Sequence, residues 1–199
     1  MINTTSEIGK TRRLVVTAML AAVSTVLMFI DFSVPFMPAF IKMDVSELPA
    51  LIASFSMGPL SGTAVCFIKN LINLTRTSTG GVGELANFMH GVFFVVPAGI
   101  IYKKLKSRKG ALAGCLLGAV IMAVLSVPIN YFITYPIYSK FMPIDAIIGM
   151  YQAIIPSVNG LLQCLIVFNM PFTFIKGIID SVLAFLIYKR ISHIIKGHH

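Results

Sequence analysis

The chain has 199 residues, of which 57% are hydrophobic and only 12% are charged, and its mean hydropathy is +0.89. These values exclude an ordinary soluble domain, which carries about 25% charged residues, and indicate an integral membrane protein. The formal net charge of +9 does not indicate nucleic-acid binding, because the basic residues lie at the ends of apolar runs, as in membrane proteins.

The sequence predicts an all-α membrane domain of six transmembrane helices, with no separate soluble domain. The expected helices cover residues 14–30, 46–57, 61–75, 84–106, 110–135 and 171–195, with outer loops at 31–45 and 136–170. Gly58-Pro59 ends the second helix after about ten residues, which is about half the hydrocarbon thickness. Residues 48–74 could therefore form one broken span or two short spans.

Three basic clusters decide between these alternatives. They are Lys10, Arg12 and Arg13; Lys103, Lys104, Lys106, Arg108 and Lys109; and Lys189, Arg190 and Lys196. All three should be cytoplasmic, which requires an even number of spans between neighbouring clusters. Two short spans satisfy this condition, so both termini are expected in the cytoplasm.

Polar residues inside membrane helices are costly, so they indicate a binding site or a pairing between helices. Three sets occur: Lys69, Asn73 and Arg76; Glu84 and Asn87; and Asn169, Thr173, Lys176 and Asp180. In the predicted topology these sets meet in the outer half of the membrane, together with Asn130, Lys42 and Asp44. Aromatic residues near them in the sequence favour a pocket for a flat, partly polar organic molecule.

Some of these residues have structural interpretations that the sequence leaves open. Lys176 and Asp180 could form only an i,i+4 ion pair, and Asn169 could cap the last helix. Lys69 and Arg76 could equally be structural residues.

No catalytic, ATP-binding or metal-binding pattern occurs in the sequence, so the chain is not expected to be an enzyme or to hold a metal or cofactor. Energy for uphill transport would have to come from another chain. His90 is expected to be a satisfied core residue, and Cys66, Cys115 and Cys164 are expected to be small buried residues.

Five blocks occur in this order: FIKMDVSELPAL (40–51), GPLSG (58–62), KNL (69–71), GVGELANF (81–88) and PFTFIKG (171–177). Together they resemble the riboflavin-specific substrate-binding subunits of bacterial energy-coupling-factor (ECF) transporters. The resemblance implies a multi-pass protein of the bacterial cell membrane that captures riboflavin from outside, and it leaves FMN binding open. It also implies three partner chains, namely an EcfT-like membrane coupling subunit and two cytoplasmic ATPases.

The resemblance also implies which residues bind. Asn130, Thr173 and Lys176 match positions that contact the flavin ring, while the loop that meets the ribityl chain matches Lys42, Met43 and Asp44. The start of a helix that lines the pocket matches Glu84 and Asn87. Related sequences often have Asn in place of Thr173, whose hydroxyl has one donor where an amide has two, so Asn169 could take over a ring contact.

Ala18 and Ala22 lie one turn apart in the first helix and match the motif that docks the coupling subunit. Small residues at this spacing let another helix approach closely, either from the same chain or from a partner. Two other functions stay open: a subunit for another vitamin such as biotin or thiamine, and a membrane scaffold or enzyme without a recognised motif.

Overall fold

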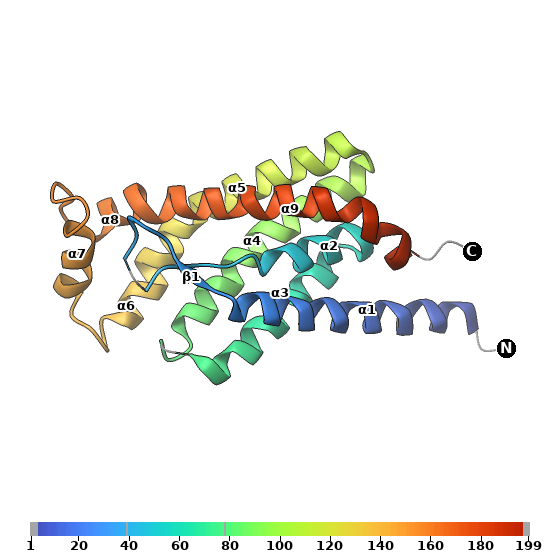
Figure 1. The fold of residues 1–199 in the computed structure, drawn as a ribbon, viewed down its shortest axis with the longest axis horizontal. Helices are drawn as coiled ribbons and strands as arrows, with labels where there is room; N and C mark the ends of the chain where they lie inside the picture. The colour runs from blue at the N-terminus through green and yellow to red at the C-terminus, as the bar shows by residue number, and fades with distance from the viewer. Residues whose placement is uncertain (1–3, 39, 78, 197–199) are drawn as a thin grey trace.

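The computed structural model describes residues 4–38, 40–77 and 79–196, and most of these residues lie in helices (Figure 1). The elements in chain order are α1 (Thr4–Phe29), β1 (Phe32–Ser33), β2 (Lys42–Met43), α2 (Glu47–Met57), α3 (Pro59–Asn73), the 3-10 turn η1 (Leu74–Arg76), α4 (Val82–Leu105), α5 (Arg108–Ile129), the π-helical η2 (Asn130–Thr134), α6 (Tyr135–Tyr138), α7 (Ile144–Gln152), α8 (Leu161–Cys164), the π-helical η3 (Leu165–Asn169) and α9 (Met170–Lys196).

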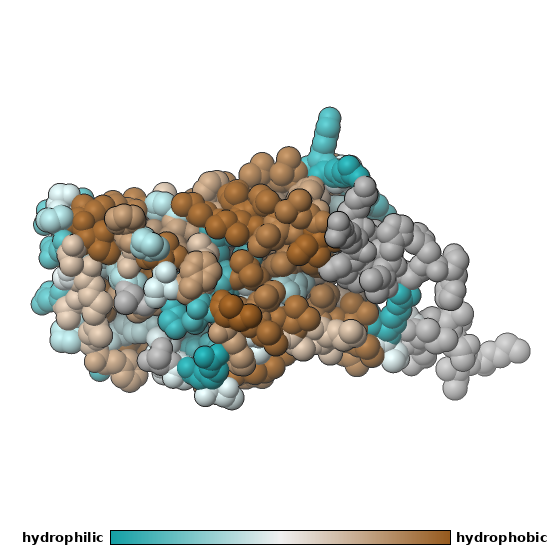
Figure 2. Space-filling view, viewed as in Figure 1, coloured by the Kyte–Doolittle hydropathy of each residue, from teal (hydrophilic) through white to brown (hydrophobic). Residues whose placement is uncertain are grey.

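Within the described parts of the chain, four helical segments are long and apolar enough to cross a membrane: Gly9–Phe29, Val82–Leu105, Arg108–Tyr138 and Leu161–Ile187. On the face shown in Figure 2, apolar residues form a broad band across the middle of the molecule, and hydrophilic residues gather toward its ends. The prediction of a helical membrane protein is confirmed to this extent: the protein is mostly helical and has four candidate membrane spans among its described residues. The helices α2 and α3 have 11 and 15 residues, so they rise only about 16 and 22 Å.

The short helices α2 and α3 are separated by a sharp turn. Gly58 has a φ of +101°, which favours glycine, and Pro59 occupies the first position of α3, where a missing N–H costs nothing. The two helices then pack closely at Gly62: a Cβ atom added there would lie only 2.8 Å from Cβ of Ser54. This contact explains why glycine stands one turn after the break.

The predicted start of the last helix, residue 171, is wrong by ten residues. Helix continues without interruption from Leu161 through α8, η3 and α9, so the alternative that Asn169 caps a helix is also wrong. Pro171 indicated a helix start in the sequence, but the π-helical turn before it accommodates a residue that lacks an N–H.

Two other helices extend beyond their predicted ends. The helix α1 begins at Thr4 instead of residue 14, so the basic segment before residue 14 is helical as well. The helix predicted to end at residue 135 continues through η2 and α6 to Tyr138.

The first loop, residues 30–46, meets the outer segment, residues 139–160, at one end of the molecule. β1 and β2 pair antiparallel within the first loop, with Phe32 opposite Met43. In the outer segment, α7 packs on α6, α8 and η3 through a buried cluster that includes Ile147, Tyr151 and Phe168. At the opposite end, α1 begins, α9 ends and α4 joins α5 (Figure 1).

Candidate functional site

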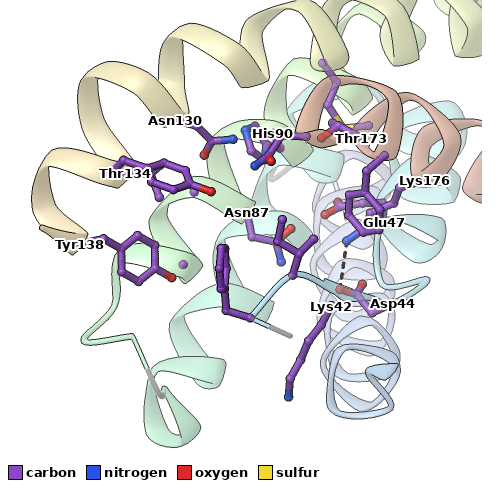
Figure 3. Close-up of a pocket in the computed structure, with 18 residues that line it drawn as sticks. Lys42, Asp44, Glu47, Asn87, His90, Asn130, Thr134, Tyr138, Thr173 and Lys176 are labelled. Atoms are coloured by element: carbon purple, nitrogen blue, oxygen red, sulfur yellow. Dashed lines mark hydrogen bonds and ion pairs between the residues drawn. The ribbon is translucent and has the colours of Figure 1, made fainter. Parts of the chain in front are cut away.

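A cavity of about 180 Å³ lies between α4, η2, α6, η3, α9 and the first loop (Figure 3). Its polar and charged wall residues are Lys42, Asp44, Glu47, Asn87, His90, Asn130, Thr134, Tyr135, Tyr138, Asn169, Thr173 and Lys176. The elements that supply them are far apart in the sequence, so the cavity forms only when the whole bundle is assembled.

Seven of the nine predicted ligand-binding residues line this cavity: Lys42, Asp44, Asn87, Asn130, Asn169, Thr173 and Lys176. The ammonium group of Lys42 is turned away from the cavity and pairs with the exposed Asp31 at 3.1 Å. Nζ of Lys176 lies at the cavity wall and forms an ion pair with Oδ2 of Asp44 at 3.0 Å (Figure 3).

Met43 and Glu84 do not line the cavity. Met43 neighbours Lys42 on β2 and is buried, since successive strand residues point to opposite faces. The carboxylate of Glu84 accepts hydrogen bonds from Asn73 at 3.0 Å, from Thr77 at 2.9 Å and from Thr79 at 3.3 Å. Glu84 therefore holds the turn between α3 and α4.

Asp44 is an ionised partner for Lys176. Burial alone would raise the pKa of this carboxyl, but the ammonium groups of Lys176 and Lys69 lower it, as do hydrogen bonds from Ser46. The net result is a pKa well below the usual value, so Asp44 is negatively charged at neutral pH. Its Oδ1 accepts from both N–H and Oγ–H of Ser46, at 2.8 and 2.5 Å.

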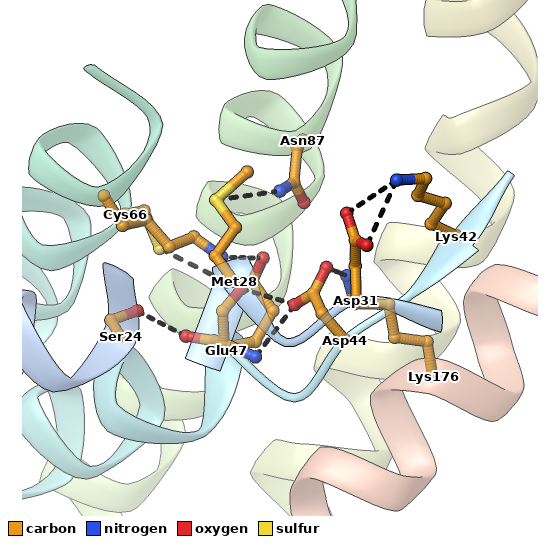
Figure 4. A network of polar contacts seen from close by, with 11 residues as sticks. Ser24, Met28, Asp31, Lys42, Asp44, Glu47, Cys66, Asn87 and Lys176 are labelled. Carbon is orange, nitrogen blue, oxygen red and sulfur yellow. Dashed lines mark hydrogen bonds and ion pairs between the residues drawn. The ribbon is translucent and has the colours of Figure 1, made fainter. Parts of the chain in front are cut away.

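A second buried ion pair lies beside the first (Figure 4). Nζ of Lys69 donates to Oε1 of Glu47 and to Oγ of Ser46, both at 2.6 Å, and the two charged side chains are 0% and 1% exposed. Sγ of Cys66 lies 3.5 Å from Oε2 of Glu47. Lys69 thus joins α3 to the start of α2 and does not reach the cavity, whereas Glu47 lines it.

The proposed alternative that Lys176 serves only as an i,i+4 partner of Asp180 does not hold. Lys176 pairs with Asp44, and the carboxyl oxygens of the fully buried Asp180 have no hydrogen-bond partner among the described residues. Arg76 also lies away from the cavity, with its guanidinium 4.4 Å from the ring centre of Phe29.

Two of the three cavity asparagines, Asn130 and Asn169, lie in π-helical turns, and Asn87 lies in the regular helix α4. Asn130 begins η2 and Asn169 ends η3, and each is at most 7% exposed. Such turns are frequent at functional sites because they change the direction of a side chain relative to a regular helix. Prolines next to these turns were a signal for them in the sequence: Pro128 precedes η2 and Pro171 follows η3.

Several wall residues were missed by the sequence analysis. The expectation that His90 is a satisfied core residue is wrong, because its buried Nε2 has no hydrogen-bond partner in the described part of the chain. The buried Oγ1 of Thr134 likewise has no hydrogen-bond partner among the residues that the structure describes. Both groups belong to the cavity wall, so they are available to a polar ligand.

A second, more apolar cavity of about 270 Å³ adjoins the first. Its wall includes Phe141, Met142 and Ile147, and it shares Phe40, Tyr135 and Tyr138 with the polar cavity. Ligand pockets usually have a volume of about 300 Å³ or more, so each cavity alone is smaller than a usual ligand pocket. Together they suit a molecule with one polar and one apolar aromatic end.

Among the described residues, no group of three or more His, Cys, Asp or Glu could hold a metal ion.

Comparisons with known proteins identify the family of the chain. Residues 12–188 match the family model for the substrate-specific component of ECF transporters. The riboflavin transporter RibU of Staphylococcus aureus is 34% identical over 185 residues, which cover 93% of each chain. The riboflavin transporter FmnP of Bacillus subtilis is 36% identical over 92% of this chain and 93% of its own length. The solved S component of a bacterial ECF transporter matches with a TM-score of 0.75 and 33% identity, covering 94% of this chain and 99% of that chain.

Proposed function

The chain belongs to the family of substrate-specific components of ECF transporters, and from this premise we propose that it captures riboflavin outside the cell for delivery through an ATP-driven coupling module. It is a transporter subunit and not an enzyme. The observation that carries the proposal is the cavity in which seven of the residues predicted to bind a flavin lie together.

The two cavities match the chemistry of riboflavin. The flavin ring has carbonyl and nitrogen atoms at one end and methyl groups at the other, and the ribityl chain adds hydroxyl groups. The polar cavity offers two buried amides, Asn130 and Asn169, and the unpaired groups of His90 and Thr134. The adjoining cavity offers apolar and aromatic walls. Relatives that are named as riboflavin transporters favour riboflavin over biotin or thiamine.

In the same proposal, the protein crosses the bacterial cell membrane six times, with α2 and α3 as two short crossings. Both termini lie in the cytoplasm. Support comes from the position of the three basic clusters: the start of α1, the α4–α5 connection and the end of α9 are at one end of the molecule (Figure 1). The cavity then lies toward the outer face.

We assign docking of the coupling subunit to α1. Ala18 and Ala22 are both exposed, and they are flanked by exposed apolar residues such as Val15, Met19 and Val26. An apolar face with two small residues one turn apart suits close packing against another helix in lipid. The expected partners are an EcfT-like membrane subunit and, through it, two cytoplasmic ATPases.

Riboflavin binding is the direct test of this function. Protein purified in mild detergent should be yellow, and ligand-free protein should quench the fluorescence of added riboflavin with a one-to-one stoichiometry. Biotin and thiamine should not compete, and FMN in the same titration shows whether a phosphate is accepted. Colourless protein that quenches no flavin, or that binds biotin or thiamine instead, would contradict the proposal.

Lys176→Ala should weaken riboflavin binding about tenfold or more, because it removes a cavity donor and leaves the buried charge of Asp44 without its ion-pair partner. The matched control is Lys140→Ala, an exposed lysine of the outer segment, which should change the dissociation constant by less than about twofold. Unchanged affinity in folded Lys176→Ala protein would mean that Lys176 serves only the fold.

A further inference from the structure

Tyr151 lies outside the cavity but contacts three of its wall residues. It belongs to α7 in the outer segment and is 0% exposed. Its hydroxyl group is 2.5 Å from the hydroxyl of Tyr135 and 2.8 Å from Oδ1 of Asn169. Its ring meets Phe40 of the first loop edge-on, with the ring centres 6.0 Å apart. One side chain therefore connects the outer segment, the first loop and two helices of the cavity wall.

The hydrogen bonds fix which group donates. A phenol has one proton, and Tyr151 donates its proton to Oδ1 of Asn169, which is a carbonyl oxygen and can only accept. In the contact between the two tyrosines, Tyr135 must therefore be the donor and Tyr151 the acceptor. Burial raises the pKa of Tyr151, so the phenol keeps its proton at physiological pH.

This arrangement decides what Asn169 offers to a ligand. Because Oδ1 is taken by Tyr151, the amide presents its two N–H groups as the remaining donors. Asn169 lines the cavity, so these donors are available to an acceptor such as a carbonyl oxygen or an unprotonated ring nitrogen.

The ring of Tyr151 also supports the irregular backbone that carries Asn169. Its centre lies 5.1 Å from that of Phe168, the residue before Asn169 in η3. The side chain thus holds both the position and the orientation of the amide.

We infer that Tyr151 is a positioning residue of the ligand site: it orients Asn169 to donate to an acceptor on the flavin ring, and its contacts with Phe40 and Tyr135 link α7 of the outer segment to the pocket wall. This inference rests on the proposed function, since it specifies how the same site recognises its ligand.

A double-mutant cycle tests the inference with purified full-length protein and riboflavin. Tyr151→Phe keeps the ring but removes the hydroxyl, and it should raise the dissociation constant about five- to tenfold. In the Asn169→Ala background, the same change should have less than about a twofold effect, because the group through which Tyr151 acts is already absent. Tyr131→Phe, an exposed residue outside the cavity, is the matched control and should leave binding unchanged.

A second measurement separates positioning from packing. Hydrogen exchange should show that riboflavin protects the backbone amides of 144–152 in the wild-type protein and protects them less in Tyr151→Phe. Equal losses of affinity in both backgrounds, or no loss in either, would overturn the inference while riboflavin binding by the wild type still stands. Wild-type protein that binds no riboflavin would instead overturn the proposed function.

Discussion

Replacing Ala18 and Ala22 together with leucine should abolish riboflavin uptake while changing the affinity for riboflavin by less than about twofold. Both residues are exposed on α1, and neither lines a described cavity. Two leucines would hold a partner helix away from the α1 backbone, and in lipid, where apolar side chains gain nothing by leaving the solvent, such close packing is a main source of association. Uptake of labelled riboflavin into vesicles that contain the coupling module measures the first quantity, and fluorescence titration in detergent measures the second.

The matched control is Ala113→Leu, an exposed small residue on α5, which should support normal uptake because it enlarges a different face. Normal uptake by the Ala18 and Ala22 variant would remove α1 from the docking surface. Loss of binding together with uptake would show that the substitutions damage the fold.

Lys69→Met should destabilise the protein by about 3–5 kcal/mol, which corresponds to a fall in melting temperature of roughly 10 °C or more. The reason is that the carboxyl group of Glu47, which is 1% exposed, would stay buried without the ammonium group that now lies 2.6 Å away. Melting of the ligand-free protein in detergent, followed by circular dichroism, measures the effect.

Two control variants show whether the loss of stability comes from the buried ion pair. Lys42→Met removes the exposed pair with Asp31 and should cost less than about 1 kcal/mol. Glu47→Leu combined with Lys69→Met should recover most of the loss, because a buried ion pair replaced by apolar side chains is often neutral in stability. If Lys69→Met melts like the wild type, the pair does not stabilise the α2–α3 packing.

The sequence predicted the features that depend on composition and on local spacing. Apolar runs identified the membrane helices, and polar residues inside those runs led to Asn130, Thr173 and Lys176, which the structure brings to one cavity. A polar group within a membrane helix needs a partner, so its presence alone is informative.

The rest depends on contacts between distant parts of the chain. Glu84 was expected at the ligand, but nearby hydroxyl groups and Asn73 satisfy its carboxylate. His90 was expected to be satisfied, but no described neighbour reaches its Nε2. Pro171 marked a helix start in the sequence, whereas the structure continues the helix through a π turn. In each case the residue type alone suggested one role, and the surrounding structure decided another.

The ion pair between Asp44 and Lys176 joins residues that are 132 positions apart. During synthesis the chain emerges at about 5–20 residues per second, so Asp44 exists for on the order of ten seconds before its partner is made. Until then the first loop lacks its ion pair with the last helix. The order of biosynthesis therefore makes ligand capture the last property that the newborn chain acquires, and a chain truncated before α9 would be inserted in the membrane but unable to hold its vitamin.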